Sequence, residues 1–415
     1  MSSYHRPEGV LVVGAGIVGL SCAWSLQDYG VEVRVVDRMH PGAGASWQNA
    51  GFVSPALCAP LPEPAMLRYG VRAVLSPGSP VQVLWRSDPR LISFMARLAS
   101  HCTAGQWRRG MAAYRPLNEQ VAQSYERQCA GGVESDLASG DVLACFADQA
   151  GRVAFMHEVE GIMGSGQDVK VEHLTGDEAR EHEPHLSARV VAGVLVKGQQ
   201  YLTPSNYVAA LARSVRARGA EILDNTTINA VERRDSILVA HGQDIDFEAE
   251  AVVLANGAWL SSLAAKHGVR APVSGGRGYS FTLPCPEPFK APTYFPSARV
   301  AVTPQGDRVR MAGIMEFGSP DAPPRSERIE TMARSVRPFL QGLDWAARHD
   351  DWMGPRPLTP DGLPLVGETR TPGVFVAGGH GMWGVTLGPL TGALLAERIA
   401  TGVAPPELRA LDPGR

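Results

Sequence analysis

A glycine-rich turn near the N-terminus has the spacing of a site that binds a dinucleotide. It reads Gly14-Ala15-Gly16-Ile17-Val18-Gly19. In such a turn the first glycine permits a tight bend, the second lets the backbone approach a pyrophosphate, and the third lets the helix pack closely on the strand. The free N–H groups and the dipole at the helix N-terminus favour an anion there. Asp37 can accept hydrogen bonds from ribose hydroxyls.

A β-α-β unit must position these groups. The apolar run Val10–Val13 is typical of a strand buried on both faces of a parallel sheet. Ile17–Tyr29 has the apolar spacing of a helix that Gly30 ends, and Val31–Val36 is a second buried strand with Asp37 at its end. The glycine spacing alone would be weak, but this context makes it a prediction of nucleotide binding.

Composition excludes several other classes of protein. The 415 residues carry 39 Lys+Arg against 42 Asp+Glu, which argues against a nucleic-acid protein that depends on bulk positive charge. No apolar run reaches the roughly 18 residues of a transmembrane helix, and Val10–Val13 is too short for a signal peptide core, so we expect a cytoplasmic protein. The six cysteines show no zinc spacing, and we expect no metal site.

Two features favour FAD over NAD as the dinucleotide. The motif begins at residue 14 with no catalytic domain before it, and further glycine-centred turns occur far downstream, as a long cofactor would need: 252–259 and 378–384. The elements predicted between and around these turns are a mostly helical stretch over 81–125, strands over 141–147, 193–196, 221–223, 251–254 and 373–376, helices over 203–218 and 388–399, and antiparallel strands from about 270 to 315.

The chain resembles the D-amino acid oxidase superfamily of FAD-dependent oxidoreductases, which includes glycine oxidase and monomeric sarcosine oxidase. It is most similar to the branch of D-amino acid dehydrogenase (small subunit) and D-hydroxyproline dehydrogenase. The matching segments keep the family's order and span nearly the whole chain: 10–38, 45–51, 251–263, 278–280, 354–367 and 378–392.

The resemblance implies an α/β fold, α+β overall, in which a Rossmann-like FAD-binding domain is interleaved with a smaller substrate domain built on an antiparallel sheet plus helices. We expect the FAD-binding domain to comprise 1–85, 171–269 and 346–415. The substrate domain is expected to comprise 86–170, as a cap, and 270–345, as the antiparallel sheet. Residues 55–98 either cover the active site, which we favour, or lie against a membrane.

The resemblance also implies which residues contact a non-covalent FAD. Arg38 and Ser46 would contact its adenosine-diphosphate half, and Ile228 would present its backbone to the adenine. The turn 379–387 would place backbone N–H groups near the pyrimidine oxygen of the flavin, where they stabilise the charge of the reduced form. The full set is Gly14, Ala15, Gly16, Ile17, Val18, Gly19, Asp37, Arg38, Ala45, Ser46, Gln48, Asn49, Ala50, Gly51, Ile228, Ala255, Asn256, Gly257, Trp259, Gly354, Arg356, Gly379, His380, Gly381, Met382, Trp383, Gly384, Val385 and Thr386.

Three residues are the candidates for substrate chemistry. Arg356 matches the family's substrate-binding arginine, and a guanidinium forms a planar, bidentate pair with a carboxylate. Tyr279 would either hydrogen-bond the substrate or pack across strands. His380, in its glycine-rich turn, is expected to contact the flavin or to be structural rather than to act as a general base.

Two departures from the family refine this prediction. Glycine oxidase-like members carry a second arginine where this chain has Met382, which disfavours glycine oxidase proper. Sarcosine oxidase-like members attach FAD through a cysteine where this chain has Gly354, so the flavin should be non-covalent.

The implied reaction oxidises an amino acid or a cyclic imino acid, acting on a CH–NH2 or CH–NH group. A hydride passes from Cα to flavin N5, and the imine hydrolyses to a 2-oxo acid or remains cyclic. The acceptor is a quinone, another carrier or O2, and a quinone would add peripheral association with the inner face of a membrane. The alternatives are a sarcosine or N-alkyl amino acid oxidase, an FAD-bearing subunit that needs a partner, and an NAD-dependent dehydrogenase.

Overall fold

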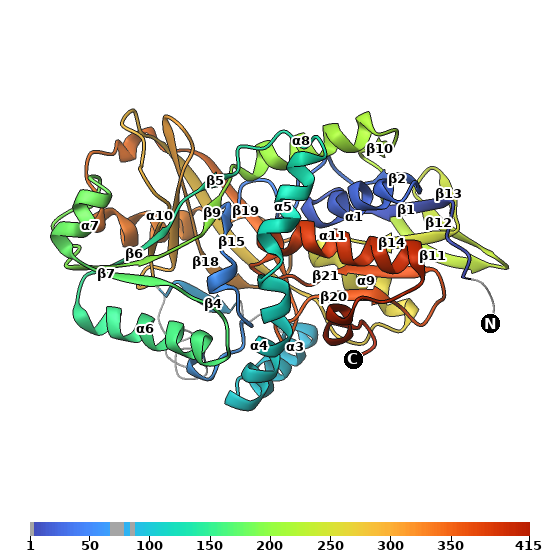
Figure 1. Cartoon of the computed structure of the whole chain (residues 1–415), viewed down its shortest axis with the longest axis horizontal. Coiled ribbons are helices and arrows are strands. Elements are labelled where there is room, and N and C mark those ends of the chain that lie inside the picture. Colours follow the sequence, from blue (N-terminus) through green and yellow to red (C-terminus); the bar gives the residue numbers. More distant parts are fainter. Residues whose placement is uncertain (1–3, 67–78, 84–87) are drawn as a thin grey trace.

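The molecule has two halves that lie side by side, each built around one sheet (Figure 1). The computed structural model describes residues 4–66, 79–83 and 88–415. The first half contains the glycine-rich turn and both described ends of the chain, and the second half contains the longest strands. The cofactor and substrate residues predicted above come from both halves, so the arrangement of the two sheets decides the site.

A six-stranded sheet organises the first half. Its strands follow the order β10 (Glu221–Leu223), β2 (Glu32–Val36), β1 (Gly9–Val13), β14 (Ala251–Leu254), β21 (Val374–Gly378) and β20 (Leu365–Glu368). All neighbours are parallel except β20, which is antiparallel to β21. The apolar runs that predicted doubly buried strands are central strands here, since β1 and β14 are buried on both faces.

Different layers cover the two faces of this sheet. Helices α1 (Ile17–Asp28), α8 (Pro204–Ala217) and α11 (Gly384–Thr401) pack on one face with Val10, Val12 and Val35. The other face carries Leu11 and Val13 and packs against α9 (Leu260–Ala264) and a three-stranded sheet of β11 (Ile228–Arg234), β12 (Ile237–Gly242) and β13 (Asp246–Ala249). This is the doubly covered, Rossmann-like arrangement that the sequence predicts.

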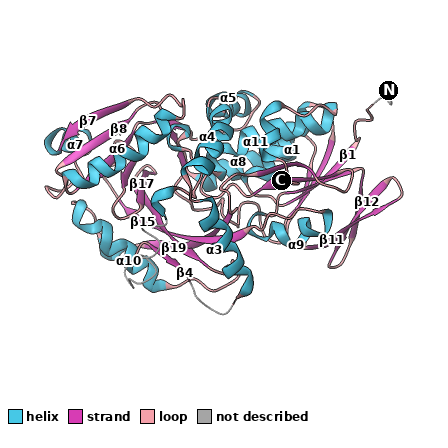
Figure 2. Cartoon of the chain, turned by 90° about the horizontal axis from the view of Figure 1, so that it is seen from below, coloured by secondary structure: helices cyan, strands magenta, loops and turns pink. Residues whose placement is uncertain are grey.

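A nine-stranded, mostly antiparallel sheet organises the second half. Its main path is β19 (His349–Leu358), β15 (Ser274–Pro284), β18 (Arg308–Phe317), β17 (Val300–Pro304), β16 (Thr293–Phe295), β6 (Val142–Phe146), β8 (Ala192–Val196) and β7 (Val171–Thr175), while β4 (Val81–Val83) pairs with β18. One face of this sheet packs on α7 (Gly176–His182) and α10 (Ser326–Val336), and α6 (Gln149–Gly164) lies against the other. Figure 2 shows these helices from below.

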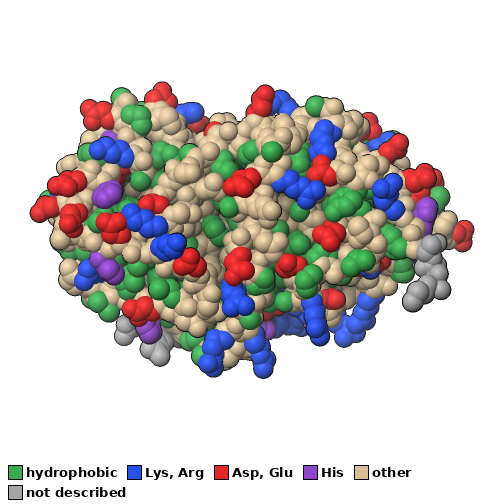
Figure 3. Space-filling view, viewed as in Figure 1, with side chains coloured by type: hydrophobic (Ala, Val, Ile, Leu, Met, Phe, Trp, Pro, Cys, Tyr) green, Lys and Arg blue, Asp and Glu red, His purple; other side chains and the backbone are tan. Residues whose placement is uncertain are grey.

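Helices α3 (Pro89–His101), α4 (Ala104–Asn118) and α5 (Val121–Ala130) lie near the junction of the halves (Figure 1). The Tyr125 hydroxyl on α5 donates to the Val385 carbonyl of α11. A small sheet of β3 (Phe52–Val53), β9 (Gln200–Tyr201) and β5 (Ala138–Ser139) also lies at the junction. Acidic and basic side chains are interspersed over the face drawn in Figure 3, in keeping with the small net charge. No helix of the described residues could cross a membrane.

Strand pairing differs from the predicted domain cuts in two places. The stretch 171–196, expected in the FAD-binding domain, contributes β7 and β8 to the nine-stranded sheet, where β8 pairs with β6. The stretch 349–358, also expected there, forms β19 and pairs with β15. Within the predicted helical stretch 81–125, residues 81–83 form β4, and 84–87 lie outside the described residues, as do 67–78 of the segment 55–98. The domain division as a whole stays a prediction.

Candidate active site

The turn after β1 requires glycine at two of its three spaced positions. Gly14 has φ +115°, and a Cβ on it would lie 2.5 Å from the Ala255 carbonyl oxygen. A Cβ on Gly19 would lie 1.9 Å from the Gly14 carbonyl oxygen. These glycines therefore have the steric roles that their spacing predicts, the tight turn and the close packing of the helix.

The N-terminus of α1 is open to an anion. Gly16 is its N-cap, without a side-chain capping bond, and the first turn contains no acidic residue. A Cβ on Gly16 would meet only the Ser46 hydroxyl oxygen, at 3.2 Å, and that oxygen accepts a hydrogen bond from the Ile17 amide at 3.1 Å. A helix of 12 residues that ends in this way fits a pyrophosphate.

The residues predicted for the adenosine half gather beyond this turn. Asp37 accepts a hydrogen bond from the Ala15 amide at 2.7 Å, and burial raises the pKa of its carboxyl group. Its carbonyl accepts from the Thr226 amide at 2.7 Å, which brings the start of β11, at Ile228, to the same edge. The Arg38 guanidinium lies 3.6 Å from the ring centre of Trp259. Within the described chain, the Asn256 side-chain oxygen is buried and has no hydrogen-bond partner.

The segment 45–51 joins the two halves of the molecule. Ser46 contacts the start of α1, as described, while Gln48 and Ala50 are held by the nine-stranded sheet. The Gln48 carbonyl accepts from the Ser280 hydroxyl at 2.7 Å, and the Ala50 carbonyl accepts from the Thr303 hydroxyl. This segment therefore runs from the start of α1 toward the large sheet.

Arg310 is a buried cation in this region that the sequence analysis missed. It is 2% exposed and donates to Gln48 Oε1 at 2.9 Å, to Thr282 Oγ1 at 2.7 Å and to the Asp350 carbonyl at 2.9 Å. These partners are neutral, and burial lowers the pKa of Arg310 to about 10. A charged residue inside the otherwise apolar run 309–312 was the available signal.

Arg356 faces a small cavity at the end of this bridging segment. Ala45 and Asn49 line the cavity on one side, and Gly278, Ser280, Ala312, Trp352, Gly354 and Arg356 line it from the sheet. Arg356 donates through Nη1 to the Ile314 carbonyl at 2.8 Å, and burial lowers its pKa to about 10. Among the described residues, no carboxylate forms an ion pair with this guanidinium. A cation held in this way can receive an anionic ligand.

Two glycines shape the cavity around the guanidinium. A Cβ on Gly278 would lie 2.3 Å from both Cζ and Nη2 of Arg356, so the guanidinium rests directly on the Gly278 backbone. A Cβ on Gly354 would lie 1.9 Å from the indole ring of Trp352, so the indole covers this glycine. The sequence analysis did not identify Trp352, because its contact with Gly354 exists only in the folded strand.

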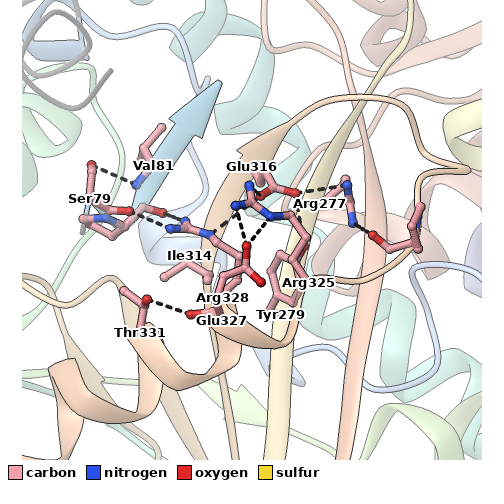
Figure 4. Close-up of polar contacts among 12 residues, drawn as sticks. Ser79, Val81, Arg277, Tyr279, Ile314, Glu316, Arg325, Glu327, Arg328 and Thr331 are labelled. Carbon is pink, nitrogen blue, oxygen red and sulfur yellow. Dashed lines mark hydrogen bonds and ion pairs between the residues drawn. The ribbon is translucent and has the colours of Figure 1, made fainter. Parts of the chain in front are cut away.

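A bulge in β18 provides the carbonyl group that accepts the hydrogen bond from Arg356. Ile314 and Met315 together oppose Gly278, and Ile314 has φ +47°, which is unusual for a β-branched residue. The next residue, Glu316, is fully buried among three arginines: Arg277 at 3.1 Å, Arg325 at 3.0 Å and Arg328 at 3.8 Å (Figure 4). This ion cluster fixes the strand that carries the bulge.

The Tyr279 hydroxyl belongs to that cluster rather than to the cavity. It donates to Glu316 at 3.1 Å, and burial raises its pKa to about 12 (Figure 4). Tyr279 also lines the cavity, but its hydroxyl is already used. Two roles are predicted for Tyr279, a hydrogen bond to the substrate or packing across strands. This geometry favours the structural role, because the hydroxyl already donates to Glu316.

The turn 379–386 closes the site from the side of the six-stranded sheet. Gly379 and Gly381 have φ +73° and +57°, and the Gly381 amide donates to the Pro357 carbonyl at 2.8 Å. With His380, Met382 and Trp383 they line a second small cavity against Leu358 and Thr359. The helix α11 that follows has no side-chain cap and no acidic residue in its first turn, which contains Gly384, Val385 and Thr386.

His380 is neutral at neutral pH. It is 2% exposed, and burial lowers its pKa to about 4. Nε2 lies 2.9 Å from the Thr391 hydroxyl, and Nδ1 is buried without a partner among the described residues. An imidazole in this state can make a hydrogen bond to a ligand but is a poor general base.

Comparison with known proteins identifies the family. The model of the family "DAO: FAD dependent oxidoreductase" matches residues 9–398. The chain belongs to this DAO family of FAD-dependent oxidoreductases. It is similar to the D-amino acid dehydrogenase of Rhizobium johnstonii, with 30% identity over 97% of this chain and 98% of that protein. Among solved structures, it is similar in fold to glycine oxidase from Geobacillus kaustophilus, with a TM-score of 0.74, 21% identity and 99% of each chain covered. It also resembles the FAD-bound L-α-glycerophosphate oxidase of Mycoplasma pneumoniae, with a TM-score of 0.72, 14% identity, and 96% and 95% coverage.

The chemistry of the site residues fits FAD. The open N-terminus of α1 suits the pyrophosphate, and the unpartnered Asn256 oxygen and His380 Nδ1 are buried polar atoms that a ligand could satisfy. Hydrogen bonds join Ala15 to Asp37 and Ile17 to Ser46, and most of the other predicted cofactor residues lie on the segment 45–51 or in the turn at 379–386; their role in binding FAD stays a prediction. Arg356 and Gly354 are exceptions, because they lie on the large sheet, in β19.

Proposed function

We propose that this flavoenzyme oxidises an α-amino acid or a cyclic α-imino acid, and that it acts on the D-enantiomer. The observation that carries the proposal is the Arg356 guanidinium. It lines a cavity beside Ala45 and Asn49 and has no carboxylate partner within the described chain. The similarity to D-amino acid dehydrogenases over nearly the full length of both chains supports the enantiomer.

Arg356 binds the substrate carboxylate in this proposal. Nη1 of the resting guanidinium donates to the Ile314 carbonyl and contacts the Met315 sulfur at 3.8 Å, which leaves the donors on Nη2 and Nε for a bidentate pair. That pair fixes the orientation of Cα, which is the main catalytic contribution the protein can make to a hydride transfer. Bound FAD supplies the hydride acceptor.

No strong base is required of the chain, because an amine that binds deprotonated needs none. His380 remains neutral and orients a ligand through Nδ1 rather than removing a proton. Trp352, which lines the cavity from β19, helps to exclude water from the reacting carbon.

Anaerobic reduction of the bound flavin tests the proposal. A panel of D- and L-amino acids, with D- and L-proline and N-methylglycine, is mixed with the holoenzyme, and bleaching of the flavin band is followed. We expect D-amino acids to reduce the flavin and Arg356→Ala to lower kcat/KM by about 1,000-fold while FAD content is kept. Reduction by N-methylglycine alone would favour the N-alkyl amino acid oxidase, and no reduction by any member would refute the proposal.

The flavin is proposed to be non-covalent. The Trp352 indole fills the space beside Gly354, and among the described residues no cysteine lines either cavity. Acid precipitation should therefore release all of the yellow chromophore into the supernatant. Colour that stays in the pellet would contradict this assignment.

The electron acceptor remains a choice between a quinone, another carrier and O2. Turnover of the isolated chain with a soluble quinone and a redox dye, compared with its rate in air, separates a dehydrogenase from an oxidase. Turnover only after addition of a cell-membrane fraction would instead indicate that a partner is needed.

A further inference from the structure

A second group of charged residues lies on the same face of the large sheet as Arg356, and the chemistry described above does not use it. It consists of Glu63, from the loop after Val53, Glu158 on α6, Tyr294 on β16, and Arg299 in the turn between β16 and β17. Each of these side chains is half-buried, and each perturbs the pKa of another member. We call these four residues the acidic recess.

Strand register connects the recess to the substrate cavity. Tyr294 pairs with Ala301, Ala301 with Ala312, Ala312 with Ser280, and Ser280 with Trp352. Directly paired residues point to the same face of a sheet, so these five residues form one row. Ala312, Ser280 and Trp352 line the cavity of Arg356. In this row only Ala301 separates the cavity from Tyr294.

The spacing suits an extended substrate side chain. Neighbouring strands are about 4.8 Å apart, so Tyr294 lies roughly 10 Å from Ala312 across the sheet. The side chains of lysine and arginine reach roughly 6–7 Å from Cα, at about 1.2 Å per bond. That reach covers part of the way from the cavity to Tyr294, and the carboxyl groups of Glu63 and Glu158 must extend toward the cavity to meet a distal amino or guanidinium group.

The charge of the recess calls for a cation. It contains two carboxyl groups and one guanidinium, and within the described chain neither Glu63 nor Glu158 forms a side-chain hydrogen bond or an ion pair. Burial, and then the neighbouring Glu158, raise the pKa of Glu63 to about 7, while Arg299 opposes the shift. Burial and, to a smaller extent, the nearby Glu63 also raise the pKa of Cys102, at the end of α3. One negative charge in the recess thus lacks a partner whenever both carboxyl groups are ionised.

Ile314 lies between the acidic recess and the Arg356 guanidinium, which we call the carboxylate clamp. The Ile314 amide donates to the Arg299 carbonyl at 3.2 Å, and the Ile314 carbonyl accepts from Arg356 at 2.8 Å. Arg299 and Ile314 both have φ in the left-handed region, at +54° and +47°. Ile314 therefore contacts the Arg356 guanidinium on one side and the backbone of the turn that carries Arg299 on the other.

We propose that the acidic recess binds the cationic end of the substrate side chain, so that basic amino acids are the preferred substrates. This inference rests on the proposed function, since it names the class of amino acid that the same site oxidises. Arg356 binds the substrate carboxylate, and Glu63 and Glu158 bind the distal cation.

Isosteric substrate pairs test the inference. D-Arginine is compared with D-citrulline, and D-lysine with D-norleucine, because each pair differs mainly in the distal charge. We expect kcat/KM for anaerobic flavin reduction to favour the cation by about tenfold or more in the wild type. In the double variant Glu63→Gln/Glu158→Gln the preference should fall to within about threefold, whereas Glu160→Gln, an exposed neighbour on α6, should keep it.

The outcomes separate this inference from the proposed function. Equal kcat/KM within each pair in the wild type, or a preference that the double variant leaves intact, would overturn the inference. In both cases reduction by D-norleucine or D-alanine would still uphold the proposed function. Failure of every amino acid to reduce the flavin would overturn both. FAD content and Tm of each variant are measured alongside, and the two single variants replace the double variant if it does not fold.

Discussion

Replacing Gly278 with alanine should displace the carboxylate clamp without touching the substrate. The Arg356 guanidinium rests on the Gly278 backbone, and a new Cβ would lie 2.3 Å from Cζ and Nη2. Ordinary contact needs roughly 3.4 Å or more, so the guanidinium must move by about 1 Å. A misplacement of this size in a positioning group costs about 100-fold in rate, or about 2.7 kcal/mol in transition-state stabilisation.

The assay is anaerobic flavin reduction, with kcat/KM determined for the best D-amino acid of the panel. Gly164→Ala is the matched control, because a Cβ at that position on α6 meets nothing within 4 Å. We expect Gly278→Ala to retain its FAD and to lose about 100-fold in kcat/KM. The control should be within about twofold of the wild type.

A double-mutant cycle shows whether the effect passes through Arg356. If it does, Gly278→Ala should cost little more once Arg356→Ala is present, because the displaced group is already gone. A Gly278→Ala enzyme with full FAD and nearly wild-type kcat/KM would refute the proposed position of the clamp. Additive losses in the cycle would instead show that the new methyl group obstructs the substrate itself.

Three further predictions concern the cofactor, stability and pH. Gly16→Ala should fold with an apoprotein Tm close to the wild type, since its Cβ meets only the Ser46 hydroxyl, but should bind FAD at least about 100-fold more weakly in a fluorescence titration. Because the folded-state pKa of His380 is about 4, below its ordinary 6.5, the unfolded chain takes up a proton first as the pH falls. This costs about 2 kcal/mol of stability at pH 5, so the loss of Tm between pH 7 and pH 5 should be smaller in His380→Gln. The preference for D-arginine over D-citrulline should increase as the pH rises through about 7, where the Glu63 carboxyl ionises, and Glu63→Gln should abolish that dependence.

Local patterns were enough to predict the half of the fold that holds the nucleotide turn. The strand over 10–13, the helix from Ile17 and the helix over 203–218 all depend on apolar periodicity and on flanking glycines, and each is found within a residue or two of its expected ends. The positions of Gly14 and Gly19 were likewise predictable, because their steric roles act between neighbouring residues of the chain.

The second half was harder, because its sheet is made of partners far apart in the sequence. β8 pairs with β6 across about 50 residues, and β19 pairs with β15 across about 75, and neither pairing leaves a local signature. The same reason hid Arg310, Trp352 and the acidic recess. The charge inside the apolar run 309–312 does mark Arg310 in the sequence, but its partner Gln48 is identified only when the segments 45–51 and 309–312 are brought together.

Ile314 connects the two charged sites, the carboxylate clamp at Arg356 and the acidic recess. A β-branched residue at positive φ costs about 1–2 kcal/mol, which the fold tolerates because Glu316 and its three arginines hold the same strand in place. In return, the two backbone groups of Ile314 point to opposite sides, one to the Arg299 carbonyl and one to the Arg356 guanidinium. Ile314 therefore connects the Arg356 guanidinium to the turn that carries Arg299 through one hydrogen bond on each side. Because the substrate carboxylate binds Arg356 while the distal cation binds the acidic recess, we expect the length of the substrate and its terminal charge to be selected together.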